Sequence, residues 1–257
     1  MIPRQAHLQS AFRSHVGHVR GLNEDACLAR PDLGIWAVAD GMGGHHSGDY
    51  ASALIVCELG RVRRPTSARE LLHDVDQTLA RCNRALLERA QDGELSGSTI
   101  VALLVFDGNF AAIWAGDSRL YRLRHGRLEQ LTRDHSYVQE LVDSGRLTAQ
   151  QAKNHPLANR ITRAIGADGE LHLDVVNGWL APEDRFLLCS DGLTGMVGND
   201  AIAAIMSNAD PEAAVDRLIE AALAAGGNDN VSAIVVRNAP GLDGEQTLPS
   251  RGSPLAR

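Results

Sequence analysis

Short apolar runs rich in β-branched residues recur through the middle of the chain, and their length is that of β-strands. They predict strands over Ile35–Ala39, Thr99–Phe106, Phe110–Ala115, Leu120–Leu123, Arg185–Cys189 and Val231–Val236. The second and third runs are separated by Asp107-Gly108-Asn109, which is typical of a β-hairpin. Strands joined in this way favour antiparallel sheets.

Three longer stretches are predicted to be helices. They cover Ser47 to about Val62, Ala68 to about Ala90, and Glu212 to about Ala225. The second helix follows Ser67 and has Glu70 three residues later, which is the pattern of a capping box. Because strands dominate the middle of the chain and helices interrupt them, the pattern favours an α+β fold with helices outside antiparallel sheets.

Two segments differ from this pattern. Residues 134–165 mix short helical pieces with polar loop, and His155-Pro156 interrupts them, so we expect an excursion from the core that forms a flap. Residues 239–257 contain three prolines, three glycines and few large apolar residues, and we expect a disordered tail there. The predicted division is therefore one domain over residues 1–238, followed by the tail.

Composition and charge narrow the class of protein. The 257 residues carry a formal net charge of -7 and no long basic stretch, which argues against a nucleic-acid partner. No run approaches the roughly 18 apolar residues of a membrane span, and the N-terminus lacks a signal pattern. The four cysteines are far apart and form no Cys-x-x-Cys pair. We therefore expect a cytoplasmic monomer that binds neither membrane nor nucleic acid.

Four aspartates stand at the ends of predicted strands or directly before one. Asp40, Asp117 and Asp191 each follow an apolar run, and Asp229 precedes the last one. One Asp-Gly pair alone is usually a turn. Four acids converging on one place would repel one another unless a divalent cation held them ionised. An all-oxygen ligand set without histidine or cysteine favours Mg²⁺ or Mn²⁺ over zinc.

A polar stretch before the first strand supplies a complementary group. In Arg20-Gly21-Leu22-Asn23-Glu24-Asp25, the planar guanidinium of Arg20 matches the geometry of a phosphate, and Glu24 adds a further oxygen donor. Taken alone, this stretch is typical of a surface loop.

Seven motifs occur in an order that resembles the bacterial protein phosphatase 2C family. They are Arg20–Asp25, Asp40–His45, Ser96–Thr99, Gly116–Arg119, His155–Gly166, Cys189–Leu193 and Asp229–Ser232, and they extend over about residues 12–237. The resemblance implies a four-layer α-β-β-α sandwich of two antiparallel sheets flanked by helices. It also implies a site for two tightly bound Mn²⁺ or Mg²⁺ ions at one end of the sandwich.

The resemblance assigns the metal ligands residue by residue. Asp40 is expected to bridge both ions, and the carbonyl of Gly41 to bind one of them. Asp191 and Asp229 are expected to bind the other ion. Glu24 is expected to bind the ion beside Gly41, either directly or through water.

Further roles follow from the same resemblance. Arg20 is expected to clamp the phosphate, Asp117 to bind a third, weaker ion, and Asn230 to orient Asp229 or the waters of the site. Met42 stands where eukaryotic members have a histidine proposed as the general acid. The general acid is therefore open between a metal-bound water and His155.

The implied activity is hydrolysis of phosphoserine and phosphothreonine in proteins by direct attack of a hydroxide that bridges the two ions. The expected partners are phosphorylated proteins and a cognate serine/threonine kinase. Two alternatives stay open: a catalytically silent homologue that binds phosphoproteins as a regulator, and a partner-switching phosphatase. Another two-metal phosphoesterase, such as a nuclease, is disfavoured by the acidic net charge.

Overall fold

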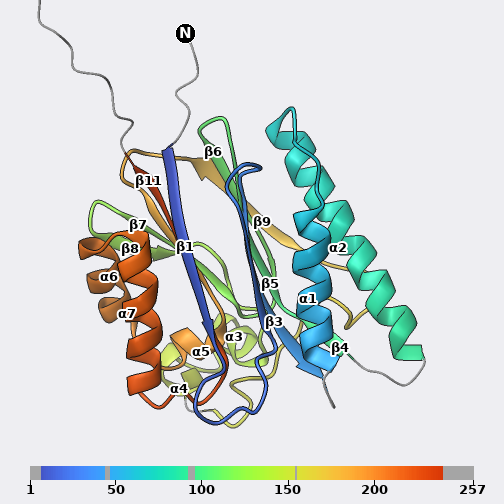
Figure 1. Cartoon of the computed structure of the whole chain (residues 1–257). Helices are drawn as coiled ribbons and strands as arrows, with labels where there is room; N and C mark the ends of the chain where they lie inside the picture. The colour runs from blue at the N-terminus through green and yellow to red at the C-terminus, as the bar shows by residue number, and fades with distance from the viewer. Residues whose placement is uncertain (1–6, 44–46, 92–95, 154, 240–257) are drawn as a thin grey trace, which may run out of the picture.

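The structure is a computed structural model that describes residues 7–43, 47–91, 96–153 and 155–239. Two antiparallel β-sheets pack face to face, and helices cover the outer face of each sheet (Figure 1). The four-layer α-β-β-α sandwich expected from the sequence is therefore confirmed. None of the helices in these ranges is both long and apolar enough to cross a lipid bilayer.

The first sheet has five strands in the order β1-β11-β10-β7-β8. Their bounds are β1 His7–His15, β11 Val231–Ala239, β10 Arg185–Cys189, β7 Arg119–Arg124 and β8 Arg127–Gln130. The helices on its outer face are α5 Asp191–Thr194, α6 Asn199–Asn208 and α7 Pro211–Ala224.

The second sheet has the order β2-β3-β5-β6-β9, and the short strand β4 pairs with β3 beside this path. The bounds are β2 Asp25–Arg30, β3 Ile35–Gly43, β4 Ser96–Ser98, β5 Ile100–Phe106, β6 Asn109–Ala115 and β9 Asp174–Trp179. The two long helices α1 Ser47–Gly60 and α2 Ala68–Gln91 lie on its outer face (Figure 1).

Strand β5 shows how the sequence produces four layers. Side chains alternate between the two faces of a strand. Ile100, Ala102 and Leu104 pack with α1 and α2, whereas Val101 and Leu103 pack between the two sheets. Because both faces of β5 are buried, its sequence is a continuous apolar run rather than an alternation of apolar and polar residues.

The sequence patterns that predicted the hairpin between β5 and β6 and the start of α2 correspond to a turn and a helix cap in the structure. Phe106 pairs with Asn109, so Asp107-Gly108 forms a two-residue turn in which both residues have positive φ. Ser67 caps α2 by accepting a 3.1 Å hydrogen bond from the Glu70 backbone N–H. The Glu70 carboxylate reaches the backbone N–H of Thr66 at 2.6 Å, one residue beyond the group that a standard capping box would use.

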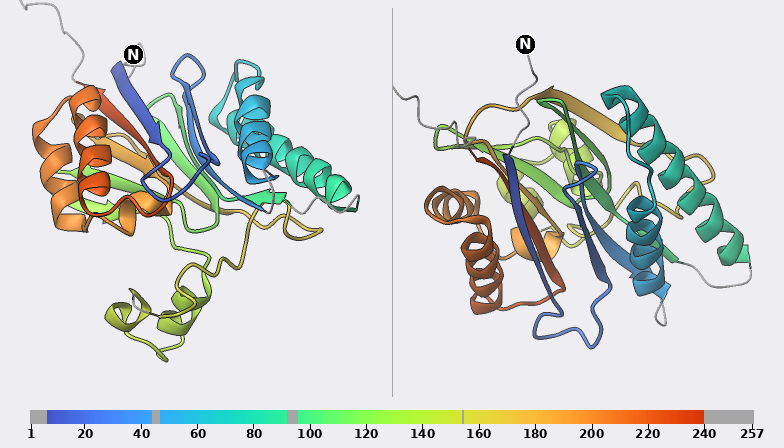
Figure 2. Two further views of the ribbon diagram at one scale, coloured as in Figure 1. Left: turned by 60° about the horizontal axis from the view of Figure 1, so that its bottom comes forward. Right: turned by 45° about the horizontal axis from the view of Figure 1, so that its top comes forward.

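The segment over residues 134–165 leaves the sandwich at the end where α5 lies. It contains α3 Tyr137–Asp143 and α4 Ala149–Lys153, and Figure 2 shows both helices projecting away from the sheets. The helical pieces predicted there are confirmed, while a role as a flap stays a prediction. The predicted disordered tail covers residues 239–257, but Ala239 is the last residue of β11, so the tail boundary was one residue too early. Residues 240–257 lie outside the described residues.

Candidate metal centre

Antiparallel pairing brings the acids of distant motifs to one end of the sandwich. Asp25 opens β2 and lies directly opposite Asp40 in β3. Asp191 follows β10 and Asp229 precedes β11, and these two strands are neighbours in the other sheet. Asp117 lies in the turn between β6 and β7, at the same end. The two sheets thus contribute acids to one cluster.

Burial and mutual repulsion act on these carboxyls together. Burial raises the pKa of Asp40 well above its usual value, and the charges of Asp25, Asp191, Asp117 and Asp229 raise it further. Burial also raises the pKa of Asp117 to about 8, with Asp191 the next cause. Proximity therefore joins all five acids in one electrostatic cluster, as the sequence predicted for four of them.

Asp191 has interactions that partly offset its burial in the cluster. Burial and the charge of Asp229 raise its pKa. A side-chain hydrogen bond with Asp40 and the positive charges of Arg119 and Arg20 act in the opposite direction. It is also the first residue of α5, where a carboxylate faces the positive end of a helix.

Two buried oxygens in the cluster have no hydrogen-bond partner. They are Oδ1 of Asp25 and Oδ1 of Asp117. Orphaned buried carboxylate oxygens are costly unless a cation or water reaches them. Among the described residues, no three His, Cys, Asp or Glu side chains are arranged to hold an ion by themselves. A hard cation that draws further ligands from carbonyl and water oxygens fits this set of donors.

The backbone of Asp40 is fixed by the motif Ser96–Thr99. The Asp40 N–H donates to Thr99 Oγ1 at 3.1 Å, and the Asp40 carbonyl accepts from the Thr99 N–H at 2.9 Å and from Ser98 Oγ at 3.0 Å. Thr99 Oγ1 also lies 2.7 Å from Oγ of Ser118, which follows Asp117. One threonine thus links the loops that carry Asp40 and Asp117.

The glycine after Asp40 allows a close approach of three chain segments. A Cβ on Gly41 would lie 2.1 Å from the carbonyl oxygen of Gly48 and 2.6 Å from that of Glu24. A Cβ on Gly48 would lie 2.5 Å from Oε1 of Glu24. The carboxylate of Glu24 is therefore held against the start of α1, beside the Gly41 backbone.

Asn230 fastens the loop that carries Arg20 and Glu24. Its buried side chain donates to the carbonyls of Val16 and Leu22, both at 2.9 Å, and accepts from the Glu24 N–H at 2.8 Å. Its backbone N–H donates to Oδ1 of Asp229 at 2.8 Å. The orienting contact with Asp229 is thus made by the backbone, while the side chain positions the opposite loop.

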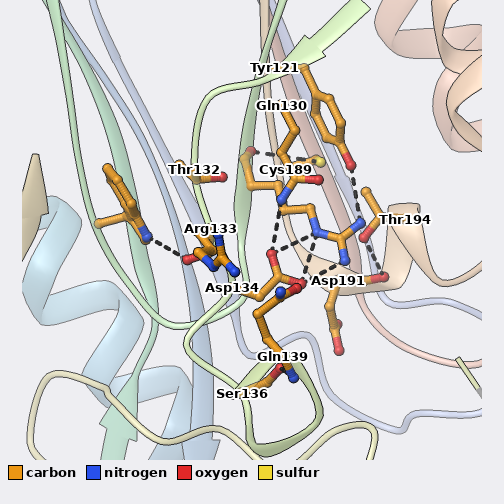
Figure 3. A network of polar contacts seen from close by, with 12 residues as sticks. Tyr121, Gln130, Thr132, Arg133, Asp134, Ser136, Gln139, Cys189, Asp191 and Thr194 are labelled. Carbon is orange, nitrogen blue, oxygen red and sulfur yellow. Dashed lines mark hydrogen bonds and ion pairs between the residues drawn. The ribbon is translucent and has the colours of Figure 1, made fainter. Parts of the chain in front are cut away.

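Arg119 is held by a network of polar contacts with Asp134 and Tyr121, two residues labelled in Figure 3. Its Nε donates to both oxygens of Asp134 at 2.9 and 3.1 Å, its Nη2 to Oδ2 at 2.6 Å, and its Nη1 to the Tyr121 hydroxyl at 3.1 Å. Burial opposes the charge of the guanidinium, but the bonds to Asp134 raise its pKa. No sequence pattern marks this pair, because Asp134 lies outside all seven motifs.

Two further residues bear on the sequence predictions. The contacts of His155 are with the Tyr137 ring, at 6.2 Å between centroids, and with the Leu157 N–H, at 3.1 Å. Both partners belong to the projecting segment, so no contact in the described part of the chain joins His155 to the acids. Asp25, in contrast, was missed as a site residue, although it stands in a motif and opens a strand opposite Asp40.

Comparison with known proteins agrees with this geometry. The family model for protein phosphatase 2C matches residues 14–230. The serine/threonine protein phosphatase PstP of Mycobacterium tuberculosis is 38% identical over 245 residues, which cover 94% of this chain. The chain spans 47% of that relative's length. The serine/threonine phosphatase stp of Listeria monocytogenes is 33% identical, with 89% of this chain and 95% of the relative covered.

Two solved structures share the fold over nearly their whole length. PppA, described as a key regulatory component of T6SS in Pseudomonas aeruginosa, is 44% identical and superposes with a TM-score of 0.84, covering 90% of this chain and 98% of PppA. The catalytic domain of PstP in complex with two manganese ions is 34% identical, with a TM-score of 0.83 and coverage of 91% and 99%.

Proposed function

We propose, from the premise that this chain belongs to the protein phosphatase 2C family, that it hydrolyses phosphoserine and phosphothreonine in proteins and requires divalent metal ions. The observation that carries the proposal is the cluster of five aspartates, in which one buried oxygen of Asp25 and one of Asp117 have no hydrogen-bond partner. Such a cluster is stabilised by cations. PstP, the relative solved with two manganese ions, has the same fold.

The residues that would hold two Mn²⁺ or Mg²⁺ ions are Asp40, the Gly41 carbonyl, Asp191, Asp229 and Glu24. When bound, the ions supply the Lewis acidity that activates water for attack on phosphorus. Asp40 lies at the centre of the cluster, since the charges of the other four aspartates all raise its pKa. We therefore assign Asp40 the role of bridging the two ions.

The remaining residues position the substrate and the site. Arg20 is half-exposed and lies beside Asp229, so its guanidinium can reach a phosphate that enters from solvent. Its planar fork would neutralise charge on the phosphate oxygens as the ester bond breaks. Asp117, at the edge of the cluster next to Asp191, is the residue we assign to a third and weaker ion.

The complete set of acids and the presence of Arg20 weigh against a catalytically silent homologue, which would have lost one of these groups. By the same family analogy, the substrates would be proteins phosphorylated by a cognate serine/threonine kinase. The similarity to PppA supports a role in controlling a secretion system of the same kind. We propose that the chain acts as a cytoplasmic monomer.

The test is a phosphopeptide assay with the purified chain, with added Mn²⁺ or Mg²⁺ and with excess chelator. Phosphate release that requires either ion and stops with chelator is the expected result. Calorimetric titration with Mn²⁺ measures the binding of the ions separately from turnover. Full activity in chelator would contradict the metal-dependent mechanism, and metal binding without turnover would favour the silent homologue.

A further inference from the structure

A cavity of about 850 Å³ opens at the end of the sandwich opposite the acids. It lies between the start of α2 and the edge strand β9, beside the hairpin that joins β5 and β6. Leu71, Phe106 and Trp179 are among the apolar side chains that line it. Trp179 pairs with Asn109 at the hairpin end of β6, whereas Asp117 follows the other end of that strand.

Strand β9 has an open edge next to this cavity. It pairs with β6 on one side, and no other strand within the described ranges pairs with it. Its side chains on one face are exposed: Val175 is 46% exposed and Trp179 is 73% exposed. The Trp179 carbonyl accepts a 2.9 Å hydrogen bond from Arg124 Nη2, so an added strand would pair with the part of β9 that precedes Trp179. An open edge beside exposed apolar side chains is where a sheet accepts an added strand.

The walls of the cavity carry positive charge only. Arg69, Arg122 and Arg124 contribute to its lining, and none of the lining residues is acidic. Glu129 and Asp184 pair with Arg122 and Arg124, respectively, while Arg69 is exposed in the first turn of α2. Arg122 Nε is buried and has no hydrogen-bond partner. Within the described residues Arg69 has no such acidic partner, so Arg69 is the cavity arginine that is available to a carboxylate.

We propose that β9 and the cavity form a docking site for an extended acidic peptide segment of a phosphoprotein substrate. The segment adds a strand to β9, places one large apolar side chain in the cavity beside Trp179, and directs its carboxylates toward Arg69. This inference rests on the proposed function, because the bound segment belongs to a substrate whose phosphorylated residue reaches the acids.

The position of the site sets which substrates use it. Strand β6 has seven residues and runs from Asn109, opposite Trp179, to Ala115, two residues before Asp117, which corresponds to about 25 Å. A segment bound at β9 must therefore be separated from the phosphorylated residue by at least about seven extended residues. Short phosphopeptides bypass the docking site, whereas a long substrate gains effective concentration at the acids.

Binding is tested without catalysis, so that a failure here is distinct from a failure of the proposed function. The probes are two pools of fluorescein-labelled octapeptides, one of Asp, Glu, Val, Leu and Phe, and one with Lys and Arg in place of the acids. Anisotropy is measured with the full chain in chelator. Acrylamide quenching gives a second readout for Trp179, because Trp36 and Trp114 are buried. The acidic pool is expected to bind and to protect Trp179, and the basic pool is not.

Two variants of α2 form a matched pair. Arg69→Glu is expected to weaken binding of the acidic pool by about fivefold, whereas Arg84→Glu, an exposed position on the same helix, is expected to leave it unchanged. The proposal would be overturned if both pools bound equally or if neither pool bound. It would also be overturned if the two variants had equal effects. Protection of Trp179 that rises with protein concentration alone would identify a second copy of the chain as the occupant and would also overturn it.

Discussion

The guanidinium of Arg20 donates a 2.7 Å hydrogen bond to Oδ2 of Asp229. This contact joins the residue assigned to the phosphate with a residue assigned to a metal ion. The hydrogen bond and the charge of Asp229 raise the pKa of Arg20, which therefore stays charged. Phosphate clamp and metal ligand thus form one unit at the entrance of the cluster.

Replacing Arg20 should separate phosphate binding from metal binding. We expect Arg20→Ala to raise KM for a phosphopeptide by about tenfold, since a charge-assisted hydrogen bond is worth roughly 1.5–3 kcal/mol. The Kd for Mn²⁺ should not weaken, because the variant removes a positive charge that competes with the ion for Asp229. Steady-state kinetics and calorimetry check the two parts. A loss of metal affinity equal to the loss in KM would show that Arg20 acts mainly by holding Asp229.

Asn230→Ala should disturb the loop of Arg20 without removing a metal ligand. The variant leaves the carbonyls of Val16 and Leu22 and the Glu24 N–H without their partner, at a cost of about 3 kcal/mol in unfolding free energy. The backbone contact with Asp229 remains. Urea denaturation and phosphopeptide KM should both change. Asn228→Ala, at an exposed position in the same loop, is the control that should change neither.

The central part of the fold was predictable from sequence because both faces of β3, β5, β10 and β11 are buried. Such strands are uninterrupted apolar runs. Strands β1 and β9 were missed for the opposite reason. Each is an edge strand with polar residues on an exposed face, such as Gln9 in β1 and Asn177 in β9, and neither contains an apolar run. Helix α6 was missed as well, because it is short and lacks a side-chain cap.

The site was predictable where a motif marks a strand end, as at Asp40 and Asp191. It was not predictable where tertiary pairing decides the contact. Asp25 becomes part of the cluster through its register with Asp40, and Asp134 is important through Arg119, which lies fifteen residues away in sequence. His155 begins one of the seven motifs, yet its segment projects from the sandwich and its side-chain contacts lie within that segment.

Stability without metal should fall as pH rises from about 4 to about 8. Burial raises the pKa of Asp25 to about 7 and that of Asp117 to about 8, from 3.8 in both cases. Between those values the folded chain binds more protons than the unfolded chain, so this stability is present at low pH and is lost as pH passes 7 to 8. The urea midpoint in chelator should therefore be lower at pH 8.5 than at pH 6.5. Asp117→Asn should reduce this difference in the urea midpoint. An unchanged difference would show that Asp117 does not contribute to the pH dependence of stability.

The projecting segment should affect large substrates more than small ones. Arg146 is exposed between α3 and α4, so Arg146→Glu alters the surface of the segment without disturbing its packing. Tyr137 is less suitable, because its ring lies 5.6 Å from the Arg160 guanidinium carbon and contacts His155. We expect kcat/KM to change several-fold for a phosphoprotein and to stay constant for para-nitrophenyl phosphate. Equal changes for both substrates would exclude a role in selection.

Asp40→Asn should be the most damaging single substitution, because Asp40 is repelled by all four other aspartates and is expected to contact both ions. Calorimetry should show loss of tight Mn²⁺ binding, and phosphopeptide turnover should fall by at least about a thousandfold. In chelator the same variant should melt at a higher temperature than the parent, since an amide relieves both burial of charge and repulsion. Asp32→Asn, at an exposed acid paired with Arg30, is the control that should leave metal binding intact. A variant that lost activity through unfolding would melt lower instead, so the two measurements together distinguish a lost ligand from a lost fold.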